Sequence, residues 1–289
     1  MSETVNLHQR NGKFVEVDEL NVFTIDQGEG EVIVLLHGLF GTSYIYRKLI
    51  PILSEKYRVV APDLPGLGFS ETPKEVYSHR YFARFIFRFL EKITDEKVHV
   101  VAHDYAGPIS FLLLNDHPEK VKSLSVINTF LNLKKFRMYF PVSVLKIPFL
   151  GNMFSMFLNS FTLRLLFNLR FVSKQKPISR DTAKDYAFLL LNGVCRKNFV
   201  KICQSIDTTI HAQRDMESGI KKMIGGRQII AGEKNPIIDL SEVEYIKQVM
   251  RLGFCNFIQG RHFLLEEYPI ECAEKIEVLV KAFSKKGKI

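Results

Sequence analysis

Asp104 is the single carboxylate in an apolar stretch, residues 98–110, with the sequence V-H-V-V-A-H-D-Y-A-G-P-I-S. The β-branched run before Asp104 predicts a buried strand, and the segment that opens with Ala106 and Gly107 predicts a helix. A residue at the apex of such a strand–turn–helix unit is held in a strained conformation, which small neighbours tolerate. An ionised carboxylate at this apex could attack a saturated carbon and form an alkyl ester. The alternative is that Asp104 only caps the helix.

Two further features could complete this chemistry. His262, in G-R-H-F-L-L-E-E, follows a predicted strand and precedes the last predicted helix, where a general base could activate water to hydrolyse the ester. The loop that begins at His37 and Gly38 follows an apolar strand and is rich in glycine and small polar residues. We therefore expect the backbone N–H groups of Leu39 and Tyr105 to form an oxyanion hole.

Strands and helices alternate around these residues. Alternating apolar and polar residues predict an antiparallel pair over residues 13–28, with a turn near Glu19. Apolar runs predict buried strands at 31–36, 57–62, 98–103, 121–127, 228–231 and 252–258, and helical spacing predicts helices at 44–56, 79–93, 106–114, 241–250 and 270–283. This order indicates an α/β fold with a mostly parallel sheet. Residues 284–288 are expected to fray.

The alternation stops between residues 131 and 215. Nine phenylalanines lie between residues 130 and 171, and apolar residues occupy nearly every helical face there. A segment of this kind is either buried or lies against something apolar. We predict a helical cap over residues 131–215, inserted into a core formed by residues 1–130 and 216–289.

Three motifs together resemble the α/β-hydrolase superfamily: H-D-Y-A-G at 103–107, D-L-P-G-L-G-F-S at 63–70 and G-R-H-F-L-L-E-E-Y-P at 260–269. They are most similar to the branch with an aspartate nucleophile, which includes the haloalkane dehalogenases and epoxide hydrolases. The resemblance covers residues 13–130 and 220–289 and hardly constrains the cap. It implies the α/β-hydrolase fold, Asp104 as the nucleophile, His262 as the general base, and an apolar pocket between core and cap.

The acid that orients the histidine in this branch is absent from both of its positions. Asn235 stands where the branch has an aspartate before proline, and Asn128 ends the strand that follows the Asp104 helix. An amide cannot stabilise an imidazolium and can favour the wrong tautomer, and the equivalent exchange in a serine triad lowers kcat by about 10⁴. Glu233 and Asp239 are nearby carboxylates that could substitute. We expect the loss to damage ester hydrolysis more than ester formation, so that a covalent adduct accumulates.

Substrate recognition departs from the family as well. The chain has no tryptophan and carries Tyr105 where the dehalogenases have a halide-binding tryptophan. Epoxide hydrolases use two cap tyrosines as acids, and only Tyr139 and Tyr186 are available in this cap, without a convincing match in position.

The side chains expected to line the substrate pocket are His37, His103, Phe130, Tyr139 and Phe263. Packing is the alternative role for His103, and support of the loop is the alternative for His37.

The net charge of +9 is unevenly distributed. Residues 121–180 contain no Asp or Glu and ten Lys or Arg residues, so the rest of the chain is close to neutral. This pattern fits a solvated face whose long basic side chains cover apolar surface, or contact with an anionic membrane surface. Nucleic acid binding is not expected, because no binding motif accompanies the charge.

The N-terminus lacks the pattern of a signal peptide, and no apolar run is long enough to predict a spanning helix. Cys195, Cys203, Cys255 and Cys272 lack C-x-x-C spacing and are expected to be buried thiols in a reducing cytoplasm. Neither a metal nor a cofactor is expected, and the glycine-rich turn at 63–70 lacks the lysine and Ser/Thr of a phosphate loop.

The leading hypothesis is a hydrolase that forms an Asp104 alkyl ester with a small apolar electrophile, a haloalkane or an epoxide. The alternative is a catalytically weakened scaffold that binds an apolar ligand or a membrane surface through its basic, phenylalanine-rich cap. A serine esterase would need G-x-S-x-G, which the chain lacks.

Overall fold

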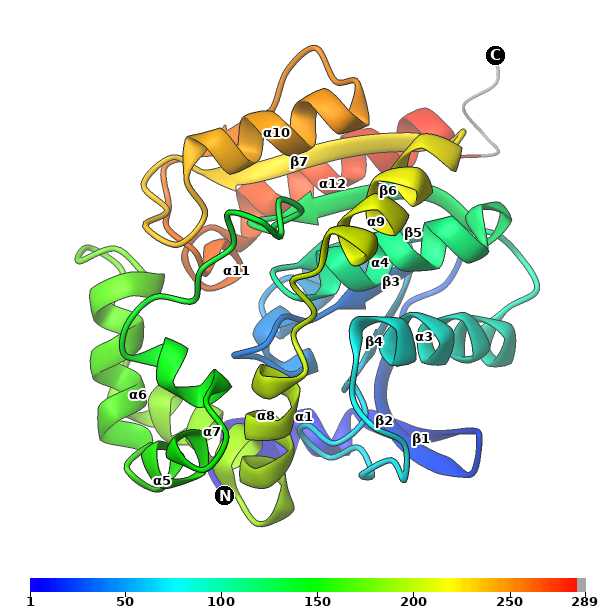
Figure 1. Ribbon diagram of the computed structural model, residues 1–289. Helices are drawn as coiled ribbons and strands as arrows, with labels where there is room; N and C mark the ends of the chain where they lie inside the picture. Colours follow the sequence, from blue (N-terminus) through cyan, green and yellow to red (C-terminus); the bar gives the residue numbers. More distant parts are fainter. Residues whose placement is uncertain (285–289) are drawn as a thin grey trace.

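A sheet of eight strands runs through the molecule in the computed structural model, which describes residues 1–284 (Figure 1). The strands are β1 (Gly12–Val17), β2 (Leu20–Gln27), β3 (Val32–Leu36), β4 (Arg58–Pro62), β5 (Val98–His103), β6 (Val121–Ile127), β7 (Gly226–Gly232) and β8 (Asn256–Ile258). Their order is β1-β2-β4-β3-β5-β6-β7-β8. The β1–β2 pair is antiparallel and all pairs from β4 to β8 are parallel, as predicted. The β2–β4 pair is antiparallel as well.

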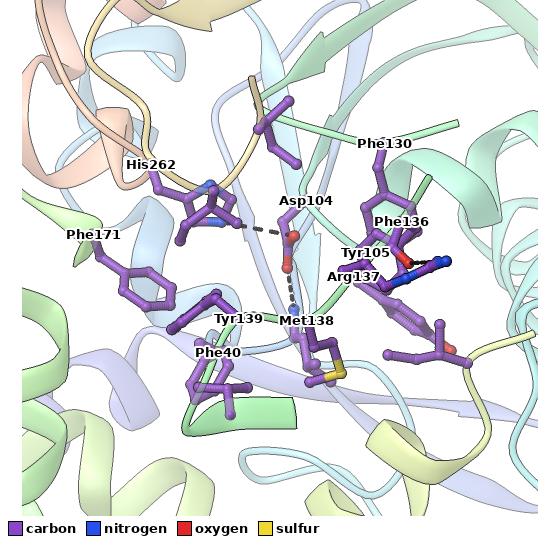
Figure 2. A pocket seen from close by; sticks show the side chains of 15 residues that line it. Phe40, Asp104, Tyr105, Phe130, Phe136, Arg137, Met138, Tyr139, Phe171 and His262 are labelled. Carbon is purple, nitrogen blue, oxygen red and sulfur yellow. Dashed lines mark hydrogen bonds and ion pairs between the residues drawn. The ribbon is translucent and has the colours of Figure 1, made fainter. Parts of the chain in front are cut away.

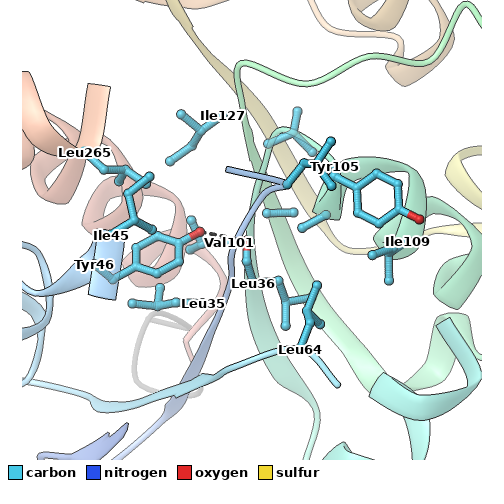
Figure 3. Close-up of a cluster of buried hydrophobic side chains, with 14 of the residues drawn as sticks. Leu35, Leu36, Ile45, Tyr46, Leu64, Val101, Tyr105, Ile109, Ile127 and Leu265 are labelled. Carbon is cyan, nitrogen blue, oxygen red and sulfur yellow. Dashed lines mark hydrogen bonds between the residues drawn. The ribbon is translucent and has the colours of Figure 1, made fainter. Parts of the chain in front are cut away.

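Helices cover both faces of this sheet. They are α2 (Ile50–Leu53), α3 (His79–Ile93), α4 (Ala106–Asp116), α9 (Ile210–Lys222), α10 (Leu240–Met250), α11 (Leu264–Glu267) and α12 (Pro269–Phe283). In Figure 1, α4 and α9 lie in front of the sheet and α12 lies behind it. β3 and β5 are buried along their whole length, because both of their faces are covered. Figure 3 shows part of the resulting core, with Leu36 and Val101 of the central strands between apolar side chains from both layers.

The cap region lies between β6 and α9. It contains η3 (Val142–Lys146), α5 (Leu150–Met156), α6 (Ser160–Leu166), η4 (Phe167–Phe171), α7 (Arg180–Leu191) and α8 (Val194–Gln204). These elements gather at the lower left of Figure 1, away from β6 and β7. Ser179 accepts a hydrogen bond from the N–H of Thr182 and so fixes the start of α7. Helix α9 begins within the range predicted for the cap, but it packs closely on α4: a Cβ at Gly219 would lie 2.0 Å from the Phe111 carbonyl oxygen.

Several elements differ from those predicted. The helix predicted at 44–56 is broken into the short turn η1 (Ser43–Tyr46) and α2, since Pro51 at the start of α2 lacks the N–H that a continuous helix needs. Strand β8 begins only at Asn256, after a left-handed residue, Arg251, that ends α10. Helix α1 (Glu3–Arg10), capped by Ser2, was not predicted. Apart from Ser284, the segment expected to fray lies outside the described residues.

Candidate active site

Asp104 lies between β5 and α4 with φ of +51°. This left-handed conformation is strained for an aspartate, and it turns the chain sharply enough to present the side chain at the end of the strand. Gly107 permits the turn, since a Cβ there would lie 1.9 Å from Oγ1 of Thr129. The Thr129 hydroxyl donates a hydrogen bond to the Asp104 carbonyl oxygen at 2.6 Å. The predicted strand–turn–helix unit is therefore present.

The Asp104 carboxylate contacts the loop that follows β3. The Leu39 N–H donates to Oδ2 at 3.0 Å, and the Tyr105 N–H also bonds to this carboxylate. The loop can approach so closely only because residue 38 is glycine: a Cβ there would lie 2.6 Å from Asp104 Cβ. Burial raises the pKa of Asp104, and the two N–H groups oppose this shift in part. The two backbone donors predicted for an oxyanion hole thus lie against the candidate nucleophile.

His262 is brought to Asp104 by the segment between β8 and α11. Its Nε2 lies 3.7 Å from Oδ1 of Asp104, and its side chain is 2% exposed. Burial lowers the pKa of His262 well below its ordinary value, with His103 nearby as a second cause. The imidazole is therefore neutral at physiological pH, and only one of its two nitrogens carries a proton.

Asn235 lies beside the other nitrogen of this ring. Its Oδ1 accepts hydrogen bonds from the N–H groups of Ile237, at 3.0 Å, and Ile238, at 3.3 Å. These two donors fix the orientation of the amide, because the NH₂ group could not replace the oxygen there. Its Nδ2 consequently faces Nδ1 of His262, at 3.5 Å.

Asn128 and the two nearby carboxylates do not contact the His262 ring. The Asn128 amide donates to the carbonyl oxygens of Arg261 and His262, each at 2.9 Å, and accepts from the Gly232 N–H at 2.9 Å. It therefore supports the backbone of the histidine loop. Asp239 caps α10 and is exposed, and Glu233 is exposed as well. Within residues 1–284, no carboxylate hydrogen bonds to Nδ1 of His262.

The site opens into an apolar cavity of about 40 Å³ (Figure 2). Besides Asp104, Tyr105 and His262, it is lined by Leu39, Phe40, Phe130, Phe136, Arg137, Met138, Tyr139, Val142, Phe171, Ile206, Ile237 and Ile238. Phe130 and Tyr139, two of the residues expected to line a substrate pocket, are among them. The sequence did not predict Phe40 or Phe171, because only the fold brings the β3 loop and η4 together; their rings lie 5.3 Å apart.

Three residues expected in the pocket lie outside its lining. His37 Nδ1–H donates to the Gly38 carbonyl oxygen, and Nε2 accepts from the Leu64 N–H, so both ring nitrogens hold the loop. His103 Nε2–H donates to the His262 carbonyl oxygen at 3.1 Å. Phe263 is buried and packs against Phe171, 4.6 Å away between ring centres. These three side chains therefore hold the loops and rings that form the site and do not face the cavity.

The two candidate cap tyrosines differ in their surroundings. The Tyr139 hydroxyl is buried at the pocket with no hydrogen-bond partner in the described part of the chain. The Tyr186 hydroxyl instead donates to Oε1 of Glu266 at 2.7 Å, and that carboxylate is ion-paired with Arg47 of the core. Of these two tyrosines, only Tyr139 has a hydroxyl without a hydrogen-bond partner among residues 1–284.

Helix α7 is joined to the core by a second buried contact. The hydroxyl of Tyr44, in η1, donates to Oδ2 of Asp185 at 2.7 Å. Together with the Tyr186–Glu266 bond, this contact attaches adjacent residues of α7 to two separate core segments.

No group of three or more His, Cys, Asp or Glu side chains among the described residues could hold a metal ion. All four cysteines are free thiols; Cys203 and Cys272 are buried as predicted, whereas Cys195 and Cys255 are half-buried. None of the helices in the described chain is long and apolar enough to cross a membrane.

Comparison with known proteins agrees with this architecture. The family model for the α/β hydrolase fold matches residues 31–269. A soluble epoxide hydrolase of Corynebacterium sp. (strain C12) is 31% identical over 144 residues, which is 50% of this chain and 49% of that protein. A haloalkane dehalogenase of Psychrobacter cryohalolentis is 32% identical over 121 residues, 40% of each chain. These matches span half or less of the relatives' own length.

Solved structures extend the likeness over nearly the whole chain. The epoxide hydrolase VrEH1 from Vigna radiata superposes with a TM-score of 0.77 at 21% identity, covering 94% of this chain and 98% of that one. At this identity the likeness concerns the fold. Both the match to the family model and the mostly parallel sheet with its inserted helices lead to one assignment: the chain belongs to the α/β hydrolase fold family.

Proposed function

We propose that this protein is a hydrolase in which Asp104 attacks a small apolar electrophile. The observation that carries the proposal is the position of its carboxylate, at the strained turn after β5 and beside both an apolar cavity and His262. An oxygen of Asp104 would form a bond to a saturated carbon of the substrate, while the bond from that carbon to a halide or an epoxide oxygen breaks. The names of the relatives supply these two substrate classes.

The structure favours the epoxide of the two classes. Opening of an epoxide leaves an alkoxide that must receive a proton, and the unpartnered Tyr139 hydroxyl in the pocket is a suitable donor. A haloalkane would instead need side-chain donors for the departing halide, such as the tryptophan that this chain lacks.

Hydrolysis of the ester is the second step. A water molecule would attack the ester carbonyl carbon and give a proton to Nε2 of His262, while the N–H groups of Leu39 and Tyr105 stabilise the oxyanion. Collapse of this intermediate would break the bond between the carbonyl carbon and the alkyl oxygen, and the leaving oxygen would take the proton from His262 and depart as the alcohol. The carboxylic acid that remains would lose its proton to solvent and restore the Asp104 carboxylate. For this step Nε2 must be free to accept a proton.

Asn235 opposes that requirement. Because its amide NH₂ faces Nδ1 of His262, Nδ1 acts as the acceptor and the proton resides on Nε2. We infer that ester formation is retained and ester hydrolysis is slow. The covalent adduct would then be the dominant species after exposure to substrate.

The alternative function is that of a non-catalytic scaffold that binds an apolar ligand. It is favoured by the lack of a carboxylate at Nδ1 of His262 in the described chain. The two functions differ in one observable, which is a covalent bond to Asp104.

Intact-protein mass spectrometry after incubation with a panel of epoxides and haloalkanes tests the proposal. The expected result is a mass increase that peptide mapping assigns to Asp104 and that Asp104→Asn abolishes. Mapping also separates this product from alkylation of the half-buried Cys195 and Cys255. Absence of an Asp104 adduct with every member of the panel would favour the scaffold.

A further inference from the structure

The outer side of the cap is unusually apolar for an exposed surface. Ten large apolar side chains within residues 140–169 are between 47% and 79% exposed. They are Phe140, Ile147, Phe149, Leu150, Met153, Met156, Phe157, Phe161, Leu165 and Leu169, and we call them the cap face. They lie on α5, α6 and η4 and on the connections before and after η3 and α5, and α5 and α6 are at the edge of the molecule in Figure 1. So many exposed apolar side chains within one short segment indicate an interaction surface.

The charged residues of the segment that carries the cap face all have one sign. Residues 131–180 contain no Asp or Glu and nine Lys or Arg residues. None of these nine takes part in an ion pair with a carboxylate within residues 1–284. Arg170 shows the arrangement locally, since it is exposed beside Leu169, which is 60% exposed. The segment that carries the cap face is therefore both apolar on its exposed side and positively charged.

We propose that the cap face docks on an anionic phospholipid surface. Exposed phenylalanine, leucine and methionine side chains would enter the boundary between headgroups and acyl chains, and the basic side chains would pair with the lipid phosphates. A second copy of the chain fits this surface poorly, because symmetric pairing would bring two sets of unpaired cations together. No spanning helix is needed for this mode of attachment.

The cap face is also the outside of the pocket wall. Phe136, Met138 and Tyr139 line the cavity, while Phe140, the next residue, is 79% exposed. Docking would therefore hold the pocket next to the lipid, where apolar electrophiles concentrate. This route for the substrate rests on the proposed function, whereas docking itself does not involve Asp104.

Co-sedimentation with vesicles tests the docking. The full chain is expected to pellet with vesicles of phosphatidylcholine and phosphatidylserine, less with phosphatidylcholine alone, and less again at high salt. The double variant Phe157→Ser/Phe161→Ser removes two side chains that are 69% and 73% exposed, and should weaken binding at least about tenfold. The matched control is Phe254→Ser, which removes a ring that is 73% exposed outside the cap.

The charge is tested by a second pair of variants. Arg170→Glu should lower binding to the anionic vesicles, and Lys221→Glu on α9, an exposed lysine outside the cap, should leave it unchanged. Asp104→Asn should bind as the parent does, so that failure of the chemistry and failure of docking are separable. Circular dichroism checks that each variant is folded.

Two results would overturn the proposal. One is equal sedimentation of the parent protein with both vesicle types or with neither. The other is a stable dimer in light scattering that Phe157→Ser/Phe161→Ser dissociates, because the cap face would then be covered by a second copy.

Discussion

The side-chain amide of Asn235 presents its NH₂ group, not its oxygen, to Nδ1 of His262, at 3.5 Å. The oxygen is engaged by the N–H groups of Ile237 and Ile238, so rotation of the amide would cost two hydrogen bonds. Under the proposed function, this contact leaves ester formation by Asp104 intact and favours the His262 tautomer that cannot act as the base in ester hydrolysis. This single relationship makes the two half-reactions separately testable.

Asn235→Asp should accelerate decay of the covalent adduct. One carboxylate oxygen can keep the bonds to Ile237 and Ile238, while the other accepts a hydrogen bond from Nδ1–H of His262. This favours the tautomer with the proton on Nδ1 and leaves Nε2 free to act as the base. The gain should reach about 10²-fold or more, within the about 10⁴ that the reverse exchange costs a serine triad. The measurement is the loss of adduct mass with time after excess substrate is removed. Asn235→Leu, which supplies no carboxylate, should give no gain, and equal decay in both variants would contradict the assignment of the tautomer.

The rate of adduct formation should fall as the pH is lowered through a pKa above the ordinary aspartate value. Burial raises the pKa of Asp104, and only its ionised form attacks. The labelling rate falls at lower pH because acid protonates the Asp104 carboxylate. Labelling rates across a pH series give the apparent pKa. His262→Ala should leave the titration in place, because the pKa of the neutral His262 is already depressed. A rate that is unchanged down to the ordinary aspartate pKa would count against a raised value.

Gly38→Ala should abolish labelling while the protein stays folded. The new methyl group would lie 2.6 Å from Asp104 Cβ and 2.8 Å from its Oδ2, so the loop or the carboxylate must move. Gly41→Ala in the same loop is the control, because its Cβ meets nothing closer than 3.6 Å. Labelling by mass spectrometry and thermal unfolding should be followed for both. Normal labelling of Gly38→Ala would show that the close approach of this loop is not required.

Stability should decrease as the pH falls from about 6.5 to about 4. Burial lowers the pKa of His8, His37 and His79 from 6.5 to about 4 in the folded protein, so the unfolded chain binds more protons in this window. A shift of this size corresponds to up to about 3 kcal/mol for one histidine. The midpoint of urea unfolding measured against pH reports the effect.

His79 offers a single-site form of this test. Both of its ring nitrogens are buried without a partner within residues 1–284. His79→Leu should therefore not lower the free energy of unfolding at neutral pH and should make its acid dependence shallower. His211→Leu, at an exposed histidine, should leave the dependence unchanged. A marked loss of stability of His79→Leu at neutral pH would indicate that the ring has polar partners.

Much of the scaffold could be predicted from the sequence. A short apolar run that alternates with predicted helices, such as Val98–His103, indicates a central strand that is buried on both faces. The family resemblance implied that Asp104 and His262 act together, and the structure places Oδ1 of Asp104 3.7 Å from Nε2 of His262.

Other features of the site could not be predicted, because they depend on contacts between segments that only the fold brings together. The direction of the Asn235 amide is set by two backbone N–H groups, and their position follows from the turn after β7. The absence of His37 from the pocket depends on its bond to Leu64, a residue of the next strand's loop.

The bonds from Tyr44 to Asp185 and from Tyr186 to Glu266 also bear on how molecules enter and leave. Lifting the cap as a rigid lid would break both bonds and expose the buried Glu266 carboxylate. Residues 136–139, in contrast, make hydrogen bonds only within residues 132–143 in the described chain. We therefore expect a ligand to enter and leave through local movement of residues 136–139, while α7 stays bound to the core.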